Sequence, residues 1–338
     1  MPYPRILAHV ADMPLAVNPP KLEAVVRFLN EKGAGTVLSA GEIEARTGDA
    51  TRAADGDQGG QGEAVAVIPV RGLIAQRMNQ VNDISAPGGT STEQLVATIR
   101  EAADDPRINS IVLDIDSPGG GVPGIPEAAA AIRDATNRKT VVAQINSLAA
   151  SGAYWLAAQA GEVVITPSGE AGSIGVYTVH QDISRATEEA GITVSLIYAG
   201  EYKTEGNLWE PLSDEAREAL QARVDYYYRM FTADVAQGRS AALGRTVTAA
   251  EVQGGWGRGR TLPAEWAVRE GLADRIATLD ETLERLAGPR EARGGATNSR
   301  RQGGGRRAGA DTGEPAPEND AGDPHANRRK ELQLYERI

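Results

Sequence analysis

A serine that could carry out acyl transfer lies in the stretch SLAASGAYWLAAQAG, residues 147–161. Ser151 follows the apolar run VVAQIN and precedes a helical pattern, so we expect its hydroxyl at a helix N-terminus. Free backbone N–H groups and the positive end of the helix dipole favour negative charge at that position. Two interpretations are open: the hydroxyl caps the helix, or it is a nucleophile that a nearby base activates.

Few residues could be that base. His9 and His325 lie near the two ends of the chain, and His180 lies at the expected end of a strand, so a Ser-His-Asp triad has weak support. Lys203 follows the apolar run ITVSLIYAG, which we predict to be a strand, and it is the other candidate. A lysine acts as a base only when neutral, and lowering a lysine pKa from about 10.4 to about 7.5 takes desolvation worth roughly 4 kcal/mol. The alternative for Lys203 is a solvated cation in a loop.

Two glycine-rich turns could complete such a site. In DIDSPGGGV, residues 114–122, Gly119 to Gly121 leave the backbone N–H groups unshielded, which suits an oxygen that carries negative charge. The alternative is an ordinary strand-to-helix turn, and no phosphate-binding or dinucleotide-binding glycine pattern is present. In GSIGV, residues 172–176, the Ser173 hydroxyl could orient a lysine amine, or Ser173 could be a plain turn residue.

The elements that must position these residues alternate between strand and helix. Apolar runs rich in Val and Ile predict strands, and they are separated by helical patterns, including a long amphipathic helix that begins at Ser213. Continuous apolar strands that alternate with helices indicate an α/β fold with a largely parallel sheet covered on both faces.

Changes in composition divide the chain into four parts. Residues 1–45 form an N-terminal helical arm, 46–63 a flexible linker, 64–287 the main domain, and 288–338 a tail rich in Gly, Arg and Glu that we expect to be disordered.

Composition also excludes several classes of protein. The net charge of −11 opposes nucleic-acid binding, and the absence of cysteine excludes a thiol nucleophile and a thiolate zinc site. We find no clustered metal ligands, no run of roughly 18 to 20 apolar residues that could cross a membrane, and no signal peptide. We therefore expect a cytoplasmic protein without metal or cofactor.

The order of these features along the chain resembles the signal peptide peptidase A family of serine–lysine peptidases, within the ClpP/crotonase superfamily. The resemblance runs across roughly residues 64 to 285 and is carried by DSPGGGVPG, SGAYWLA, GSIGV, AGEYKTEGN with PLSDEA, YRMFTADVAQGR and GLAD. It implies a ClpP/crotonase-like fold, Ser151 as nucleophile and Lys203 as general base. It further implies that the backbone N–H groups of Gly120 and Gly152 form an oxyanion hole. Ser173, Gly119 and Tyr154 would support the site.

The N-terminal stretch PLAVNPPKLEAVVRFLNEKG resembles the phage branch of that family, the capsid protein C type of head-maturation protease. This implies a soluble endopeptidase, without a membrane anchor, that acts in the host cytoplasm or inside a procapsid. Its substrates would be capsid or scaffold proteins and its own tail, which could be a scaffold-like remnant. The resemblance also implies a ring-like homo-oligomer, and the Ala/Gly-rich surroundings of Ser151 suggest a preference for small apolar residues at the cut bond.

Two alternatives come from other classes. A crotonase-type acyl-CoA enzyme would use the glycine N–H groups but would need a carboxylate acid/base and a CoA pocket. A non-catalytic capsid assembly or scaffold component would need none of these residues.

Overall fold

The computed structural model describes residues 14–17, 64–77 and 89–287. The predicted linker, the predicted tail and the helical pattern within the N-terminal arm lie outside these residues. Pro14 to Val17 are the part of the N-terminal arm, residues 1–45, that the structure describes.

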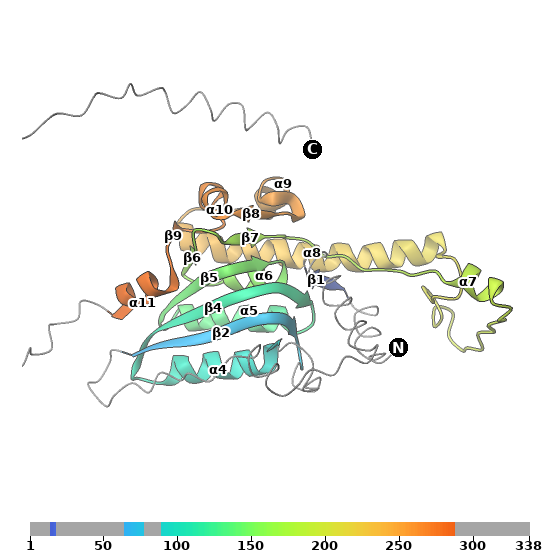
Figure 1. The fold of residues 1–338 in the computed structure, drawn as a ribbon, viewed down its shortest axis with the longest axis horizontal. Helices are drawn as coiled ribbons and strands as arrows, with labels where there is room; N and C mark the ends of the chain where they lie inside the picture. The colour runs from blue at the N-terminus through green and yellow to red at the C-terminus, as the bar shows by residue number, and fades with distance from the viewer. Residues whose placement is uncertain (1–13, 18–63, 78–88, 288–338) are drawn as a thin grey trace, which may run out of the picture. The chain divides into compact units, whose positions relative to one another are not determined.

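A nine-stranded sheet organises the described part of the chain (Figure 1). Its main path runs β3-β2-β4-β5-β6-β9, and every neighbouring pair on this path is parallel. Two pairs depart from this: β1 is antiparallel to β4, and β7, which is parallel to β5, is antiparallel to β8. The strands are β1 (Leu15–Val17), β2 (Ala64–Ala75), β3 (Thr90–Ser91), β4 (Ile108–Gly121), β5 (Thr140–Ala150), β6 (Glu162–Ile165), β7 (Glu170–Gly172), β8 (Thr261–Pro263) and β9 (Arg275–Ile276).

Helices cover both faces of this sheet because its central strands are apolar on both sides. In β4, Ile111 and Leu113 belong to the large core, whereas Val112 between them points to the opposite face. The large core includes residues of α4 (Thr92–Asp104), α5 (Ile125–Thr136) and α6 (Gly152–Ala157), and α11 (Leu279–Ala287) covers the second face. The predicted α/β architecture is therefore confirmed.

The long helix α8 (Asp214–Leu243) begins where the sequence predicts, because the Ser213 hydroxyl accepts a hydrogen bond from the Ala216 N–H at 3.1 Å. Its C-terminal half is packed into the core from Phe231 onward, whereas residues 217–230 are exposed or only partly buried. The smaller elements are α7 (Ser184–Glu189), α9 (Ala249–Gly254), the 3-10 turn η2 (Gly257–Gly259) and α10 (Ala264–Glu270).

One predicted strand is wrong. Residues 192–200, ITVSLIYAG, are irregular and lie in a segment that we call the arm, residues 178–212. The Ile197 side chain is 99% exposed, and Ile192 and Tyr198 are also exposed. An apolar run becomes a strand only when a neighbouring strand takes its hydrogen bonds and a core takes its side chains. Within the described part of the chain, residues 192–200 have neither. In Figure 1 the arm, which includes α7, lies at the N-terminal end of α8, away from the sheet.

Candidate active site

Ser151 joins the end of β5 to the start of α6. Its N–H donates to the Gly172 carbonyl at 2.7 Å, and its own carbonyl accepts from the Trp155 N–H at 2.9 Å. Its φ of 54° lies in the left-handed region, which is uncommon for a residue other than glycine and which clusters at functional sites. The residue is buried, with 1% of its surface exposed.

The Ser151 hydroxyl does not cap α6. Although Ser151 occupies the N-cap position, its side chain makes no capping hydrogen bond and instead donates to the Gly175 carbonyl at 3.4 Å. A hydroxyl that capped the helix would accept a hydrogen bond from the second or third N–H of that helix. The capping interpretation is therefore wrong for the conformation described here.

The glycine-rich turn is the end of β4, and it packs closely against the start of α6. A Cβ atom on Gly119 would lie 2.9 Å from the Gly152 nitrogen, and one on Gly152 would lie 3.5 Å from the Gly120 nitrogen. A Cβ on Gly120 would overlap the Ile74 carbonyl. The structure thus brings Gly119, Gly120 and Gly152 together beside Ser151, in an approach that side chains at these positions would block.

Ser117, which sequence reasoning did not single out, fastens this turn. Its hydroxyl donates to the Gly72 carbonyl at 2.6 Å and accepts from the Gly119 N–H at 3.1 Å. A buried serine two residues before a glycine run is the signal that could have indicated this role, because serine hydroxyls commonly bond to backbone groups close in sequence.

Ser173 and Tyr154, the two expected supporting side chains, have different surroundings. Ser173 follows Gly172, the acceptor of the Ser151 N–H, and it too has a positive φ, 53°. Tyr154 is fully buried in α6, and its hydroxyl donates to the Leu272 carbonyl at 2.9 Å. Burial raises the pKa of the Tyr154 hydroxyl well above its usual value, so this group stays protonated and holds α6 to the GLAD segment.

Lys203 is exposed on the arm, and this chain does not bring it to Ser151. Its neighbour Tyr202 lies beside Glu215 in the first turn of α8, whose negative charge raises the pKa of the Tyr202 hydroxyl. From Glu215 to Phe231 the helix advances roughly 24 Å, and it is Phe231 that stacks on Trp155, one turn after Ser151. The arm's own hydrogen bonds, such as Ile183 N–H to Leu208 carbonyl at 2.8 Å, hold it together locally.

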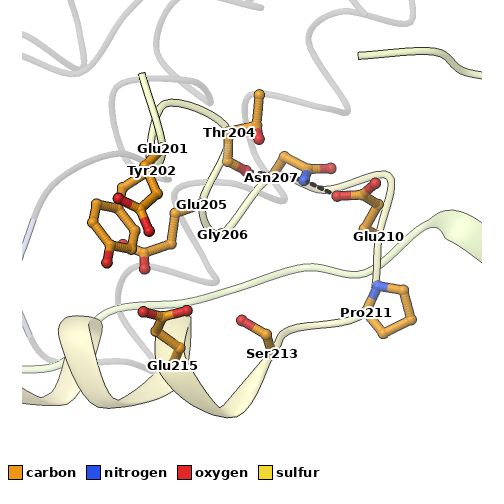
Figure 2. A pocket seen from close by; sticks show the side chains of 10 residues that line it. All are labelled: Glu201, Tyr202, Thr204, Glu205, Gly206, Asn207, Glu210, Pro211, Ser213 and Glu215. Carbon is orange, nitrogen blue, oxygen red and sulfur yellow. Dashed lines mark hydrogen bonds between the residues drawn. The ribbon is translucent and has the colours of Figure 1, made fainter. Parts of the chain in front are cut away.

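Figure 2 shows a hollow formed by the end of the arm and the start of α8, and its lining is acidic. Residues 201–215 form the whole of it, and they include four glutamates, Glu201, Glu205, Glu210 and Glu215. Asn207 donates to Glu210 at 2.7 Å across it. The hollow contains neither Ser151 nor the glycines, so it is separate from the serine site.

A second hollow, of about 400 Å³, opens at the GSIGV turn, which contacts Ser151. Gly175, whose carbonyl accepts from the Ser151 hydroxyl, is part of its lining. The rest comes from the GSIGV turn, from one face of α8, from α9 and from η2, and consists of Ile174, Val176, Gln221, Val224, Asp225, Tyr228, Gln253, Arg258 and Gly259. This hollow has room for a side chain that enters from outside the chain.

The described residues contain no group of three His, Asp or Glu side chains that could hold a metal ion. Within the same ranges, no helix has both the length and the apolar composition of a membrane span.

Comparison with known proteins identifies the family. The chain is 31% identical over 310 residues to the "Capsid assembly protease C" of Escherichia phage lambda, an alignment that covers 86% of this chain and 67% of the phage protein. Residues 133–293 match the family description "Peptidase family S49". The chain belongs to peptidase family S49. The resemblance to the signal peptide peptidase A family and to its phage capsid protease branch is therefore confirmed.

Other relatives align with about two thirds of this chain. The "Head-tail preconnector protein GP5" of Enterobacteria phage P21 is 31% identical over 66% of this chain, and the chain spans 42% of that protein's length. The "Protease 4" of Salmonella typhi is 28% identical over 67% of this chain, which spans 34% of that protein's length. The chain therefore corresponds to about two thirds of one phage relative and to less than half of the other.

Proposed function

We propose that this S49 protein is a serine endopeptidase that processes capsid or scaffold proteins during maturation of a phage head. The observation that carries the proposal is the state of Ser151, whose buried hydroxyl makes no capping bond and is held at a positive φ beside Gly120 and Gly152. Strained backbone at a serine whose hydroxyl is not used to cap its helix is typical of a nucleophile. The phage relatives' names, "Capsid assembly protease C" and "Head-tail preconnector protein GP5", support the class of substrate.

In the proposed reaction, neutral Lys203 takes the proton of the Ser151 hydroxyl as its oxygen attacks a peptide carbonyl carbon. The N–H groups of Gly120 and Gly152 donate to the oxyanion that forms. The protonated lysine then gives its proton to the departing amine, which leaves an ester between Ser151 and the acyl part of the substrate. Water, deprotonated by the same lysine, hydrolyses this ester. Ser173 would orient the lysine amine, with Gly119 and Tyr154 in support.

We further propose that Lys203 of one copy of the protein completes the Ser151 site of another copy. Lys203 lies on an exposed arm, and the hollow at the GSIGV turn is open to a side chain from outside. A homo-oligomer in which neighbouring copies exchange arms would satisfy both observations, and it would shield folded proteins from cleavage until the oligomer forms.

A complementation experiment tests the dyad and its arrangement together. Ser151→Ala and Lys203→Ala proteins are each assayed for cleavage of fluorescent casein and for shortening of the chain by intact mass, alone and after co-expression. Each variant alone should be inactive, and the mixture should regain about a quarter of wild-type activity, because about one interface in four pairs an intact serine with an intact lysine.

Arg185→Ala, which removes another exposed cation of the arm, is the matched control and should keep wild-type activity. A mixture that stays inactive would place both dyad residues in one chain. Activity that survives in Ser151→Ala would refute the peptidase mechanism and favour an assembly component.

A further inference from the structure

A short strand from the N-terminal arm lies directly against the glycines of the proposed oxyanion hole. β1 pairs antiparallel with the end of β4, so that Leu15, Ala16 and Val17 lie opposite Gly121, Gly120 and Gly119. All three β1 residues are buried, with at most 3% of their surface exposed. In Figure 1, β1 lies at the carboxyl end of β4.

The same segment is held from its other side. The Leu15 N–H donates to the Tyr177 carbonyl at 2.9 Å, and the Tyr177 N–H donates to the Leu15 carbonyl at 3.1 Å. Tyr177 follows the GSIGV turn that contains Gly175, the acceptor of the Ser151 hydroxyl. β1 is therefore an extended peptide clamped between the two backbone segments that flank Ser151.

The Ala16 carbonyl oxygen lies close to the glycines of the proposed oxyanion hole. A Cβ atom on Gly152 would lie 3.1 Å from the Ala16 oxygen and 3.5 Å from the Gly120 nitrogen, and a Cβ on Gly119 would overlap the Ala16 oxygen. An extended peptide that adds a strand to an open edge, with a carbonyl beside oxyanion donors, is how a peptidase holds a substrate backbone. β1 makes these contacts with residues of its own chain.

We propose that Pro14–Val17 occupies the substrate cleft of the Ser151 site as a built-in peptide, and that a protein substrate binds as an extended strand only after this segment has left. The inference rests on the proposed function of Ser151. It also predicts which substrate residue the cleft accepts. Because Ala16 is fully buried against Gly120, the position beside the oxyanion glycines should accept a small residue. A free protein is then kept inactive by its own segment.

A disulfide that locks β1 in place tests the proposal. The chain contains no cysteine, so Leu15→Cys with Tyr177→Cys introduces the only two thiols, at directly opposite positions where Cα atoms are typically about 5.5 Å apart. The measurement is the rate at which a fluorophosphonate probe labels Ser151. The oxidised protein should react at least about tenfold more slowly than the reduced protein, and dithiothreitol should restore the rate.

The Leu15→Cys single variant should not respond to dithiothreitol. An oxidised double variant, shown by mass to contain the disulfide, that reacts as fast as its reduced form would overturn the proposal. Thiols that remain free under oxidant would contradict the pairing of Leu15 with Tyr177 on which it rests.

A second variant opens the cleft instead of locking it. Ala16→Arg places a large charged side chain where none fits, so labelling of Ser151 should become severalfold faster. A fluorescent peptide of residues 12–19 should bind Ala16→Arg/Ser151→Ala more tightly than Ser151→Ala, measured by anisotropy on proteins shown by circular dichroism to be folded.

The two readouts separate the inference from the proposed function. Peptide binding confined to the Ala16→Arg background, without labelling of any protein, would refute the peptidase function and keep the cleft occupancy. Equal labelling of wild type and Ala16→Arg, with equal peptide binding, would overturn the occupancy and keep the peptidase.

Discussion

The indole of Trp155 stacks on the ring of Phe231, with centroids 4.4 Å apart and planes 5° from parallel. The indole N–H also donates to Asp234, one turn further along α8, at 2.8 Å. This pair attaches α6, which follows Ser151, to the C-terminal half of α8. Because α8 is one continuous helix, the same attachment sets the direction in which its N-terminal half carries the arm and Lys203.

The packing of Trp155 against Phe231 should contribute strongly to the stability of the folded protein. Trp155→Ala should lower the free energy of unfolding by about 3–5 kcal/mol, because a fully buried indole leaves a cavity. Trp155→Phe keeps a ring on Phe231 but loses the bond to Asp234, and it should cost about 1–2 kcal/mol. Urea unfolding checks both values, and equal losses in the two variants would show that stacking contributes little.

The positive φ of Ser151 gives a prediction about stability that is independent of catalysis. Ser151→Gly should be about 1 kcal/mol more stable than Ser151→Ala, because glycine adopts φ of 54° without strain whereas alanine keeps its Cβ. Neither variant has a hydroxyl, so neither should be labelled by a fluorophosphonate. Thermal unfolding of the two proteins side by side is the measurement, and an alanine variant of equal or higher stability would argue against strain at this position.

Gly120, in the turn at the end of β4, should tolerate no side chain. A Cβ on Gly120 would overlap the Ile74 carbonyl, which is backbone and cannot rotate away, so Gly120→Ala should cost about 3 kcal/mol or more and slow peptide cleavage. Gly254→Ala in α9 is the matched control. A Cβ there meets nothing within 4 Å, so this variant should be neutral or up to about 1 kcal/mol more stable. Denaturant unfolding of both variants decides, and a stable Gly120→Ala protein would contradict the packing described.

The aspartate of the GLAD segment has a structural role. Asp274 pairs with Arg239, whose side chain is fully buried, through bonds of 2.6 and 3.0 Å, and it also accepts from the Val163 N–H at 2.6 Å. Arg239→Met should cost about 3–5 kcal/mol, because it leaves the Asp274 carboxylate without its cation.

Arg239→Met/Asp274→Asn should cost less than the two single variants added together, because the double variant leaves no unpaired charge. Denaturant unfolding of the three proteins measures this coupling. Strictly additive losses would mean that the pair contributes no interaction of its own.

Local sequence patterns were enough to predict most of the fold. Val/Ile-rich runs predict β2, β4, β5 and β6, because strands buried on both faces must be apolar throughout. Ser213 predicts the start of α8 because its hydroxyl can serve a backbone N–H three residues ahead. The same reasoning failed for residues 192–200, where an equally apolar run has no partner strand within the described residues and remains exposed.

By itself, the sequence determined which residues could take part in the chemistry: a serine at a helix start, two glycine turns, Lys203 as the candidate base, and no cysteine. Those features depend on residue type and short spacing, which the chain carries directly. The tertiary structure alone decided that the Ser151 hydroxyl leaves its helix uncapped, that Lys203 is held away from it, and that Ala16 lies against Gly120. Each of these depends on backbone groups far apart in the chain finding hydrogen-bond partners and burial together, and no local pattern records which partners they find.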